Sequence, residues 1–348
     1  MSDIKTIGIL GGGQLGRMLA VAAARLGKHV VIFAPEDHPP AAEVAAEHIQ
    51  AAFEDADALA RFAERCDVIT LEWENIPLEV YDHLGDTPCF PDAKALEITQ
   101  DRMLEKNFLT RLALPVAPFY GVNDEDDLLT GLANTRTPAI LKTRRFGYDG
   151  KGQVRVNAGA EAAEAVAAIE GAPAILEGFV NFSAEISVIA ARSRSGEIAC
   201  FDPGQNDHED GILRVTNVPA TQPAGTLQDA VLMAGKILNA LDYVGVMGVE
   251  LFVTEHGLVV NEMAPRVHNS GHWTQNGCEI DQFEQHIRAI CDLPLGSGQR
   301  HSDVKMVNLI GEGGIPEQPE GALHLYGKAE ARPGRKMGHI NYARPKAQ

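Results

Sequence analysis

Val246-Met-Gly-Val-Glu-Leu-Phe-Val253, Thr254-Glu-His-Gly257 and Leu258-Val-Val-Asn-Glu262 form one continuous stretch that predicts two antiparallel strands joined by a tight turn. A hairpin centred near residue 256 puts position 250 opposite position 261 or 262. Like charges opposed across strands destabilise a sheet, and a shared divalent cation would remove that repulsion. Oxygen ligands, with Asn261 as a further one, favour Mg²⁺. We therefore expect Glu250 and Glu262 to bind Mg²⁺; the alternative, two carboxylates on a solvated face, is disfavoured by the flanking apolar residues.

A pattern of strands and helices extends upstream of this hairpin. From Pro138 the sequence indicates short apolar strands and two amphipathic helices, and the longer strands alternate with turns. Residues 139–262 are therefore expected to be α+β with antiparallel strands. The further strands are expected over 139–141, 174–176, 184–191 and 197–201, and the helices over 160–169 and 227–241.

The first hundred residues alternate strand and helix patterns instead. This βαβαβ order predicts a parallel, doubly wound sheet. The strands are expected over 4–10, 29–34 and 68–71, and the helices over 14–26, 55–65 and near 78–84. Pro88, Pro91 and Asp92 break the pattern, so we place a domain boundary near residue 95. A long amphipathic helix is expected over 93–112, before Pro115.

The composition is that of a globular protein. The chain has 348 residues, 45% hydrophobic and 22% charged, which suggests two or three domains. The chain contains no run of about 18 apolar residues, so we expect no membrane span, and no signal peptide is recognised at the N-terminus. The net charge of −18 argues against non-specific binding of nucleic acid. Five widely spaced cysteines predict neither disulfides nor a zinc site, so we expect reduced thiols and a cytoplasmic protein.

The charge is unevenly distributed along the chain. Residues 36–92 hold fifteen acidic and two basic residues, which we interpret as solvated helix faces. Residues 328–348 hold six basic residues and one acidic residue. In Lys328-x-x-x-Arg332-Pro-Gly-Arg335-Lys336, a Pro-Gly turn would point several cations in one direction. Two interpretations stay open: a solubilising end of the chain, or a site for a phosphate or carboxylate.

Gly11-Gly-Gly-Gln-Leu-Gly16 matches the pattern GxGxxG between a predicted strand and a predicted helix. Its glycines permit a tight turn and the close approach of a ligand to the helix N-terminus. Glu36 lies 20 residues beyond this motif, where a nicotinamide-dependent dehydrogenase holds the ribose. Pro35 and Pro39-Pro40 crowd that acid, and the motif alone is not specific. We therefore disfavour a dehydrogenase and retain an anion or nucleotide phosphate near this turn.

Gly147-Tyr-Asp-Gly-Lys-Gly152 places three glycines around one lysine. The backbone amides of such a loop can cradle phosphate, and Lys151 adds positive charge. It is not a Walker A loop, because no Ser or Thr follows the lysine and no helix opens there; a hairpin between two strands is expected instead. Lys142, at the polar end of the preceding apolar run, is placed to aim inward at a phosphate chain. A flexible surface turn is the alternative.

Ala264-Pro-Arg-Val-His-Asn-Ser-Gly-His272 directly follows the expected metal ligand Glu262. Arg266 can bind a carboxylate or phosphate through two parallel hydrogen bonds. His268 can transfer protons or polarise an anion. We interpret His272 as structural.

The order of these features resembles the ATP-grasp fold over about residues 100–295. It runs from a lysine on a strand, through a glycine loop and an acidic hinge (Glu177-Gly-Phe-Val180), to carboxylates on neighbouring strands. Over the whole chain, six segments together resemble the N5-carboxyaminoimidazole ribonucleotide synthetases of purine biosynthesis. They are Gly11-Gly-Gly-Gln-Leu-Gly-Arg17-Met, Glu72-Trp-Glu-Asn75, Gln100-Asp-Arg102, Gly147-Tyr-Asp-Gly-Lys-Gly152-Gln, Asn261-Glu-Met-Ala-Pro-Arg-Val-His-Asn-Ser270-Gly-His, and Tyr326-Gly-Lys328 with Gly334-Arg-Lys-Met-Gly-His339.

This resemblance implies an ATP-dependent ligase that forms a C–N bond. ATP would phosphorylate bicarbonate to carboxyphosphate, and the amine of 5-aminoimidazole ribonucleotide would be carboxylated through released CO₂, leaving ADP and phosphate. The implied architecture is a Rossmann-like substrate-binding domain (1–100), an ATP-grasp domain (101–295, with a lid over about 117–180) and a small C-terminal subdomain (296–348). ATP and Mg²⁺ are the implied cofactors, and a homodimer without nucleic-acid or membrane partners is expected.

The resemblance also implies roles for individual residues. The triphosphate would be held by Lys142, Gly147, Tyr148, Asp149, Gly150, Lys151, Gly152 and Gln153. The rest of the ATP site would comprise Glu177, Gly178, Phe179 and Val180 at the adenine, Glu185 at the ribose, and Arg102, His208, Asn261 and Glu262. The metal ligands would be Glu250 and Glu262. Bicarbonate and substrate chemistry would involve Tyr148, Asp149, Arg266, His268 and Lys328. The aminoimidazole ribonucleotide would contact Gln14, Leu15, Glu74, Arg335 and Lys336.

Two positions depart from the family's pattern. Trp73 stands where Phe is usual, and His208 has acidic neighbours where the family tends to carry Val and Arg. The nearest alternative function is another carboxylate–amine ligase, such as a formate-dependent glycinamide ribonucleotide transformylase. A nicotinamide oxidoreductase and a non-catalytic nucleotide-binding protein are the alternatives from other classes.

Overall fold

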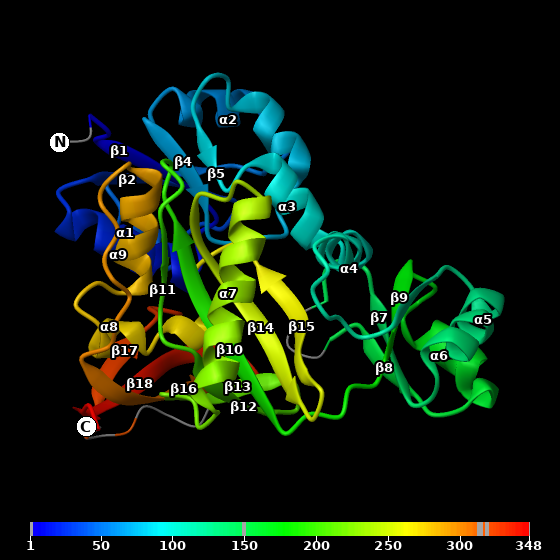
Figure 1. The fold of residues 1–348 in the computed structure, drawn as a ribbon. Helices are drawn as coiled ribbons and strands as arrows, with labels where there is room; N and C mark the ends of the chain where they lie inside the picture. The colour runs from blue at the N-terminus through cyan, green and yellow to red at the C-terminus, as the bar shows by residue number, and fades with distance from the viewer. Residues whose placement is uncertain (1–2, 148–150, 312–315, 317–319, 348) are drawn as a thin grey trace.

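The computed structural model describes residues 3–147, 151–311, 316 and 320–347. Its N-terminal part is a five-stranded parallel sheet in the order β3-β2-β1-β4-β5 (Figure 1). Apolar clusters with helices on both faces confirm the predicted doubly wound sheet. The strands are β1 (Thr6–Leu10), β2 (His29–Ala34), β3 (Glu47–Gln50), β4 (Val68–Leu71) and β5 (Cys89–Phe90), and the helices are α1 (Gln14–Arg25), η1 (Ala42–Val44), α2 (Ala56–Ala63) and η2 (Leu78–His83).

Local signals set the boundaries of these elements. After α1, Gly27 adopts a left-handed φ of 69°. At the start of α2, the side chain of Asp55 accepts a hydrogen bond from the backbone N–H of Ala58. The helix expected near 78–84 is a 3-10 helix. The edge strands β3 and β5 escape the sequence pattern because β3 is polar and β5 has only two residues.

The prediction of a single long helix over residues 93–112 is wrong. Two helices stand there, α3 (Ala93–Gln100) and α4 (Arg102–Arg111). Asp101 between them has an extended backbone, and its carboxylate accepts hydrogen bonds from the backbone N–H groups of Met103 and Leu104. Arg144 also binds this carboxylate through two nitrogens, at 3.1 and 2.7 Å. Asp101 therefore caps a new helix inside an apolar period that looks continuous.

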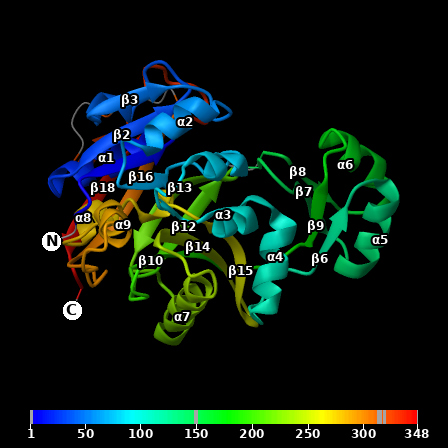
Figure 2. The ribbon, with the colours of Figure 1, turned by 90° about the horizontal axis from the view of Figure 1, so that it is seen from above.

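A four-stranded antiparallel sheet, in the order β6-β9-β7-β8, forms a separate lobe far from both termini (Figures 1 and 2). It has its own apolar core and occupies the segment predicted as a lid. The strands are β6 (Phe119–Val122), β7 (Ala139–Thr143), β8 (Gln153–Val156) and β9 (Ala174–Gly178), and the helices are α5 (Glu125–Thr135), η3 (Gly159–Glu161) and α6 (Ala162–Ala168).

The largest sheet has the order β15-β14-β10-β12-β13-β16-β18-β17, and β11 pairs with β10. Its neighbours are antiparallel, which confirms the α+β expectation for this part of the chain. The last three strands continue this sheet through β13 rather than forming one of their own. The strands are β10 (Ala184–Arg192), β11 (Ile198–Cys200), β12 (Gly204–Glu209), β13 (Ile212–Val218), β14 (Gly245–Thr254), β15 (Gly257–Ala264), β16 (Ser302–Ile310), β17 (Ala322–Leu325) and β18 (Lys336–Pro345).

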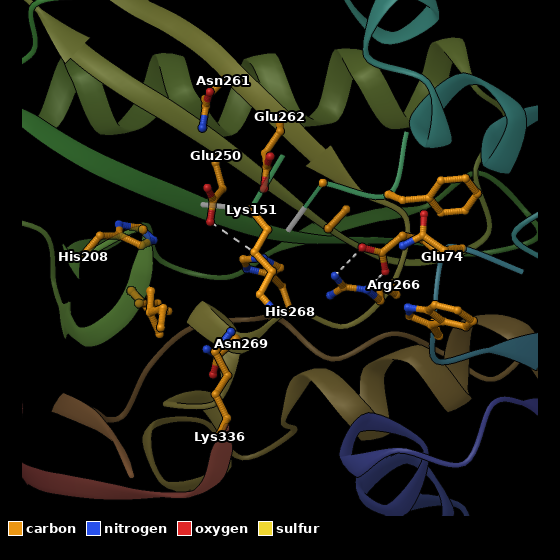
Figure 3. Close-up of a pocket in the computed structure, with 18 of the residues that line it drawn as sticks. Glu74, Lys151, His208, Glu250, Asn261, Glu262, Arg266, His268, Asn269 and Lys336 are labelled. Atoms are coloured by element: carbon orange, nitrogen blue, oxygen red, sulfur yellow. Dashed lines mark hydrogen bonds and ion pairs between the residues drawn. The ribbon is translucent and has the colours of Figure 1, made fainter. Parts of the chain in front are cut away.

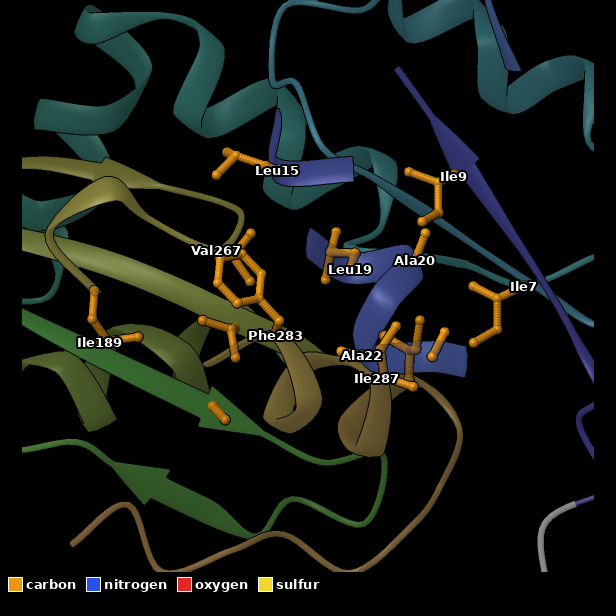
Figure 4. Packing of buried hydrophobic residues seen from close by; sticks show 14 of the residues in the cluster. Ile7, Ile9, Leu15, Leu19, Ala20, Ala22, Ile189, Val267, Phe283 and Ile287 are labelled. Carbon is orange, nitrogen blue, oxygen red and sulfur yellow. The ribbon is translucent and has the colours of Figure 1, made fainter. Parts of the chain in front are cut away.

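Helices α1 and α9 (Gln282–Ile290) join the N-terminal sheet to the largest sheet (Figure 4). Leu19 of α1 and Ile287 of α9 belong to one buried cluster with Ile7 and Ile189. Each such side chain contributes roughly 1.5–3 kcal/mol when buried, so this contact fixes the two sheets against each other. The remaining helices are α7 (Ala224–Ala240), η4 (Asn269–Gly271) and α8 (Thr274–Gly277). Within the described residues, no helix is long and apolar enough to cross a bilayer.

Candidate active site

A cleft of about 1040 Å³ lies between the three parts of the fold. It is lined by residues of the two antiparallel sheets and of the segments that follow β1 and β4 in the N-terminal part. Figure 3 shows part of its lining, with the side chains of Glu250, Glu262 and His268 directed toward one another. The structure thereby brings most of the predicted site residues to one cavity. Those on its wall are Gln14, Leu15, Glu74, Arg102, Lys142, Gly147, Lys151, Gln153, Glu185, His208, Glu250, Asn261, Glu262, Arg266, His268, Lys328, Arg335 and Lys336.

The other predicted site residues fall into two groups. Tyr148, Asp149 and Gly150 lie outside the described residues. Gly152 and the hinge Glu177–Val180 are described but are not part of the cleft lining. Their roles toward the nucleotide stay predictions.

Glu250 and Glu262 are paired across β14 and β15, which confirms the expected hairpin and selects position 262. Burial and then repulsion by Glu262 raise the pKa of Glu250 to about 8. Burial also opposes ionisation of Glu262, but Arg102 and Lys142 outweigh it and hold the pKa of that carboxyl below its usual range. Nearby positive charge therefore stabilises the ionised form of Glu262 more than that of Glu250.

The chemistry of this carboxylate pair fits a magnesium ion. The described residues contain no cluster of three or more His, Cys, Asp or Glu side chains that could hold a metal. Mg²⁺ does not need such a cage, because it binds through one or two carboxylates and keeps waters or phosphate oxygens as its other ligands. Asn261 lines the cleft beside the two carboxylates and offers one more oxygen.

Cations from α4 and β7 lie beside this pair. Arg102 Nη1 is 3.3 Å from Glu262 Oε2, and Lys142 Nζ donates to Glu177 Oε2 at 2.9 Å. Glu177 is buried and also lies 3.7 Å from Lys106. Burial would raise the pKa of Glu177, but Lys142 and then Lys106 outweigh it and lower that pKa to about 2. Glu177 therefore anchors Lys142 at the cleft.

The turn after β1 holds an anion, and this anion is a carboxylate of the protein. Glu72 accepts hydrogen bonds from the backbone N–H groups of Gly13, at 2.8 Å, and Gly16, at 3.2 Å. A Cβ at Gly13 would come within 2.8 Å of Glu72 Oε1, so a larger residue there would displace this carboxylate. Part of the anion-binding capacity expected at this helix start is thus used internally. Glu36, the acid of the disfavoured dehydrogenase hypothesis, is exposed.

Glu74 and Arg266 form a two-point ion pair across the cleft (Figure 3). Arg266 Nη2 donates to Glu74 Oε1 at 2.7 Å, and Arg266 Nε donates to Oε2. Burial would lower the pKa of Arg266 and raise that of Glu74, but their mutual attraction reverses both shifts. Because one partner follows β4 and the other follows β15, a substrate anion would meet an arginine already oriented by the N-terminal part.

A chain of hydroxyl groups fixes the orientation of His268. Ser187 Oγ donates to Ser270 Oγ at 2.7 Å, and Ser270 Oγ lies 2.8 Å from His268 Nδ1. The backbone N–H of Ser270 also donates to Nδ1, so this nitrogen is an acceptor and Nε2 carries the proton of the neutral ring. Nε2 lies 3.7 Å from Glu250 Oε1. Burial and then Arg266 lower the pKa of His268 to about 3, so the ring is neutral near pH 7.

His208 and Glu185 form an ion pair on the cleft wall, with 2.9 Å between Nδ1 and Oε2. Burial would lower the pKa of His208, but Glu185 and the nearby carboxylate of Glu250 outweigh it and raise that pKa. The pair brings the predicted ribose contact next to the histidine whose acidic neighbours depart from the family's pattern. His272 is buried and bonded to Gln282, as expected for a structural histidine.

The C-terminal cations also reach the cleft. Arg332, the Pro333-Gly334 turn, Arg335 and Lys336 line it together with Lys328. Lys328 Nζ lies 5.8 Å from the ring centre of Tyr326, whose hydroxyl is 2.9 Å from His339 Nδ1. Their place on the cleft wall is compatible with an anion site, which stays a prediction.

Two consecutive residues at the site were not predicted from the sequence. Glu105 Oε1 accepts a hydrogen bond from the backbone N–H of Met263, and Lys106 Nζ donates to the carbonyl oxygen of Asn261, both at 2.6 Å. Their spacing of three and four residues from Arg102 places all three on one helix face. That spacing is the one signal in the sequence that could have identified them.

Comparisons with known families match nearly the whole chain. Residues 4–100 match the ribonucleotide synthetase preATP-grasp domain, residues 107–283 the ATP-grasp domain, and residues 305–348 the phosphoribosylaminoimidazole carboxylase C-terminal domain. The chain is 53% identical to the N5-carboxyaminoimidazole ribonucleotide synthase of Brucella melitensis, covering 98% of this chain and 97% of that one. It is 43% identical to the Bacillus subtilis synthase, covering 97% and 90%.

Solved structures agree with these matches. The N5-carboxyaminoimidazole ribonucleotide synthetase of Thermus thermophilus is 47% identical, with a TM-score of 0.92 over 97% of this chain and 93% of that one. The Aspergillus clavatus synthase in complex with ADP and 5-aminoimidazole ribonucleotide is 31% identical, with a TM-score of 0.92 over 99% and 95%. The chain therefore belongs to the N5-carboxyaminoimidazole ribonucleotide synthase family, with an ATP-grasp fold.

Proposed function

We propose that this chain carboxylates 5-aminoimidazole ribonucleotide to N5-carboxyaminoimidazole ribonucleotide in purine biosynthesis, with ATP and bicarbonate consumed and ADP and phosphate released. The observation that carries this proposal is the single cleft between the three parts of the fold. It joins paired carboxylates, oriented cations and a neutral histidine within reach of one another. That combination suits two anionic substrates that must react with each other.

The ATP end of the cleft would be formed by the largest sheet and the lobe of β6–β9. Phosphoryl transfer depends mainly on positioning and on stabilisation of the developing charge. Lys142, oriented by Glu177, and Arg102, oriented by Glu262, supply fixed positive charge for the phosphates. Glu250 and Glu262, with Asn261, would hold Mg²⁺, which when bound neutralises charge on the transferring group.

The bicarbonate and ribonucleotide end would lie near Arg266 and the C-terminal cations. Arg266, held by Glu74, presents an oriented guanidinium, and His268 directs its Nε2–H into the cleft. A hydrogen-bond donor without net charge suits an oxygen of bicarbonate or carboxyphosphate. Lys328 would take part in the bicarbonate chemistry, and Arg335 and Lys336 would bind the ribonucleotide.

Carboxyphosphate hydrolyses readily, so the reaction needs water to be excluded. The lobe of β6–β9 contributes Lys142, Phe146 and Gly147 to the cleft wall and is suited to cover the cleft. We propose that it closes as a lid when ATP binds. A homodimer remains a prediction that sedimentation equilibrium would test.

A coupled assay of ADP release tests the function directly. We expect release to require both bicarbonate and 5-aminoimidazole ribonucleotide, and N5-carboxyaminoimidazole ribonucleotide to form in equal amount. ADP release that responds to formate in place of bicarbonate would instead support the formate-using alternative. ATP binding without turnover under all conditions would contradict an enzymatic role.

A further inference from the structure

Strand β15 turns two consecutive side chains into the cleft, which a regular strand cannot do because its side chains alternate between faces. The pairing with β14 skips Asn261: Glu250 faces Glu262, and the next residue of β14 faces Val260. Asn261 is therefore the extra residue of a β-bulge. Val260 and Met263, on either side, belong to the apolar core, although Met263 also reaches the cleft wall. Asn261 and Glu262 both line the cleft with polar side chains (Figure 3).

The backbone of this bulge is held from α4 by two adjacent side chains. Lys106 Nζ donates to the carbonyl oxygen of Asn261, and Glu105 Oε1 accepts from the N–H of Met263, each at 2.6 Å. These two backbone groups flank Glu262 on both sides. A bulge disrupts the ladder locally and leaves backbone groups to be satisfied by other partners, and these side chains supply them.

The same helix face also reaches the carboxylate itself. Arg102, three and four residues before Glu105 and Lys106, places Nη1 at 3.3 Å from Glu262 Oε2. One face of α4 thus contacts three successive residues of β15. Glu105 and Lys106 are only 2% and 1% exposed, so water cannot replace them as partners of the bulge.

We propose that Glu105 and Lys106 are positioning residues of the metal site: they fix the bulge at Asn261 and thereby aim Asn261 and Glu262 at one cation. Glu105 also lies on the cleft wall, but its Oε1 is engaged by the N–H of Met263, so we assign both residues an action through the β15 backbone. The proposal rests on the proposed magnesium site of Glu250 and Glu262. It predicts that loss of these contacts weakens metal binding beyond any general loss of stability.

Direct metal binding tests this assignment. Mn²⁺ serves as the probe, and free Mn²⁺ is measured by electron paramagnetic resonance in a titration of the protein with ADP present. Glu105→Leu and Lys106→Met each leave a buried backbone group unpaired, and we expect each to weaken Mn²⁺ binding about tenfold. Glu105→Gln keeps an acceptor oxygen for Met263, so binding is expected within about twofold of the parent.

A matched control separates positioning from stability. Phe108→Leu changes a buried apolar side chain on the same helix that makes no hydrogen bond to the bulge backbone. It should lower the melting temperature but leave Mn²⁺ affinity unchanged. Should Lys106→Met fail to fold, the comparison of Glu105→Leu with Glu105→Gln decides the matter alone.

The outcomes distinguish the two proposals. If the parent protein with ADP does not bind Mn²⁺, the metal site itself is wrong. If the parent binds Mn²⁺ and Glu105→Leu binds it equally well, the positioning role is refuted while the metal site stands. Equal weakening in Phe108→Leu would also refute it, because general destabilisation would then explain the effect.

Discussion

Replacement of Glu250 by glutamine is expected to stabilise the metal-free protein and to abolish its response to Mg²⁺. The Glu250 side chain is 13% exposed and faces Glu262 across two strands. Burial and then repulsion by Glu262 raise its pKa from 4.5 to about 8. Glutamine keeps the shape but cannot ionise, so the substitution removes both the repulsion and a metal ligand.

The sign of the pH dependence follows from this raised pKa. Below pH 4.5 the carboxyl carries its proton in the folded and in the unfolded chain, whereas between 4.5 and about 8 only the folded protein retains it. The free energy of unfolding of the metal-free parent therefore falls as the pH rises through this window and levels off above it. At about 1.4 kcal/mol per pH unit, the contribution lost reaches about 3 kcal/mol near pH 7. Glu250→Gln does not incur this loss.

Thermal melting in EDTA between pH 5 and pH 8 measures the effect. The melting temperature of Glu250→Gln relative to the parent should rise with pH, and Mg²⁺ with ADP should stabilise the parent but not the variant. Glu255→Gln is the matched control, because it lies in the turn of the same hairpin with its side chain 85% exposed. A difference between Glu250→Gln and the parent that stays constant with pH would refute the reasoning, as would equal stabilisation of both by Mg²⁺ and ADP.

Three further substitutions test other parts of the cleft. Glu262→Gln should abolish ATP hydrolysis while circular dichroism shows a retained fold; near-normal turnover would contradict its metal role. Lys328→Ala should lower carboxylation at least about tenfold, through loss of a charged contact, and change the melting temperature little, because the half-buried side chain lies at the cleft wall; unchanged activity would refute its assignment. Glu74→Gln should lower stability by about 2 kcal/mol and raise KM for the ribonucleotide, since the half-buried Arg266 loses its charged partner; an unchanged KM would argue against this substrate site.

The sequence predicted the hairpin of the metal site because a short turn determines which residues pair. It left both 261 and 262 open as the partner of Glu250. The bulge at Asn261 shifts the pairing by one residue, and the turn alone does not predict that shift. It predicted the helix boundaries where glycine or aspartate signals stood alone. The break between α3 and α4 at Asp101 could not be predicted, because apolar residues recur at helical spacing on both sides of it. Arg144, which also binds Asp101, lies 43 residues further along the chain.

The contacts of Glu105 and Lys106 illustrate a limit of a different kind. Their partners are backbone atoms 158 and 155 residues further along the chain, and backbone atoms have no signature in the sequence. Only the spacing from Arg102 shows that these polar side chains share a face, and on a helix that pattern is typical of solvent exposure. Burial of that face against β15 depends on how α4 follows the break at Asp101.

The net charge of −18 and a cleft for anionic substrates are compatible because basic side chains gather at the cleft and several are oriented there. Arg266 is held by Glu74, Lys142 by Glu177, and Arg102 contacts Glu262, so each of these three cations is oriented by a carboxylate. Such pairs contribute little long-range attraction, because their opposite charges largely cancel at a distance and salt screens the remainder. Their effect is short-ranged: each guanidinium or ammonium group is already aimed before a ligand arrives, which lowers the entropy lost on binding. Recognition in this cleft therefore depends on the geometry of paired charges, which the composition of the chain does not reveal.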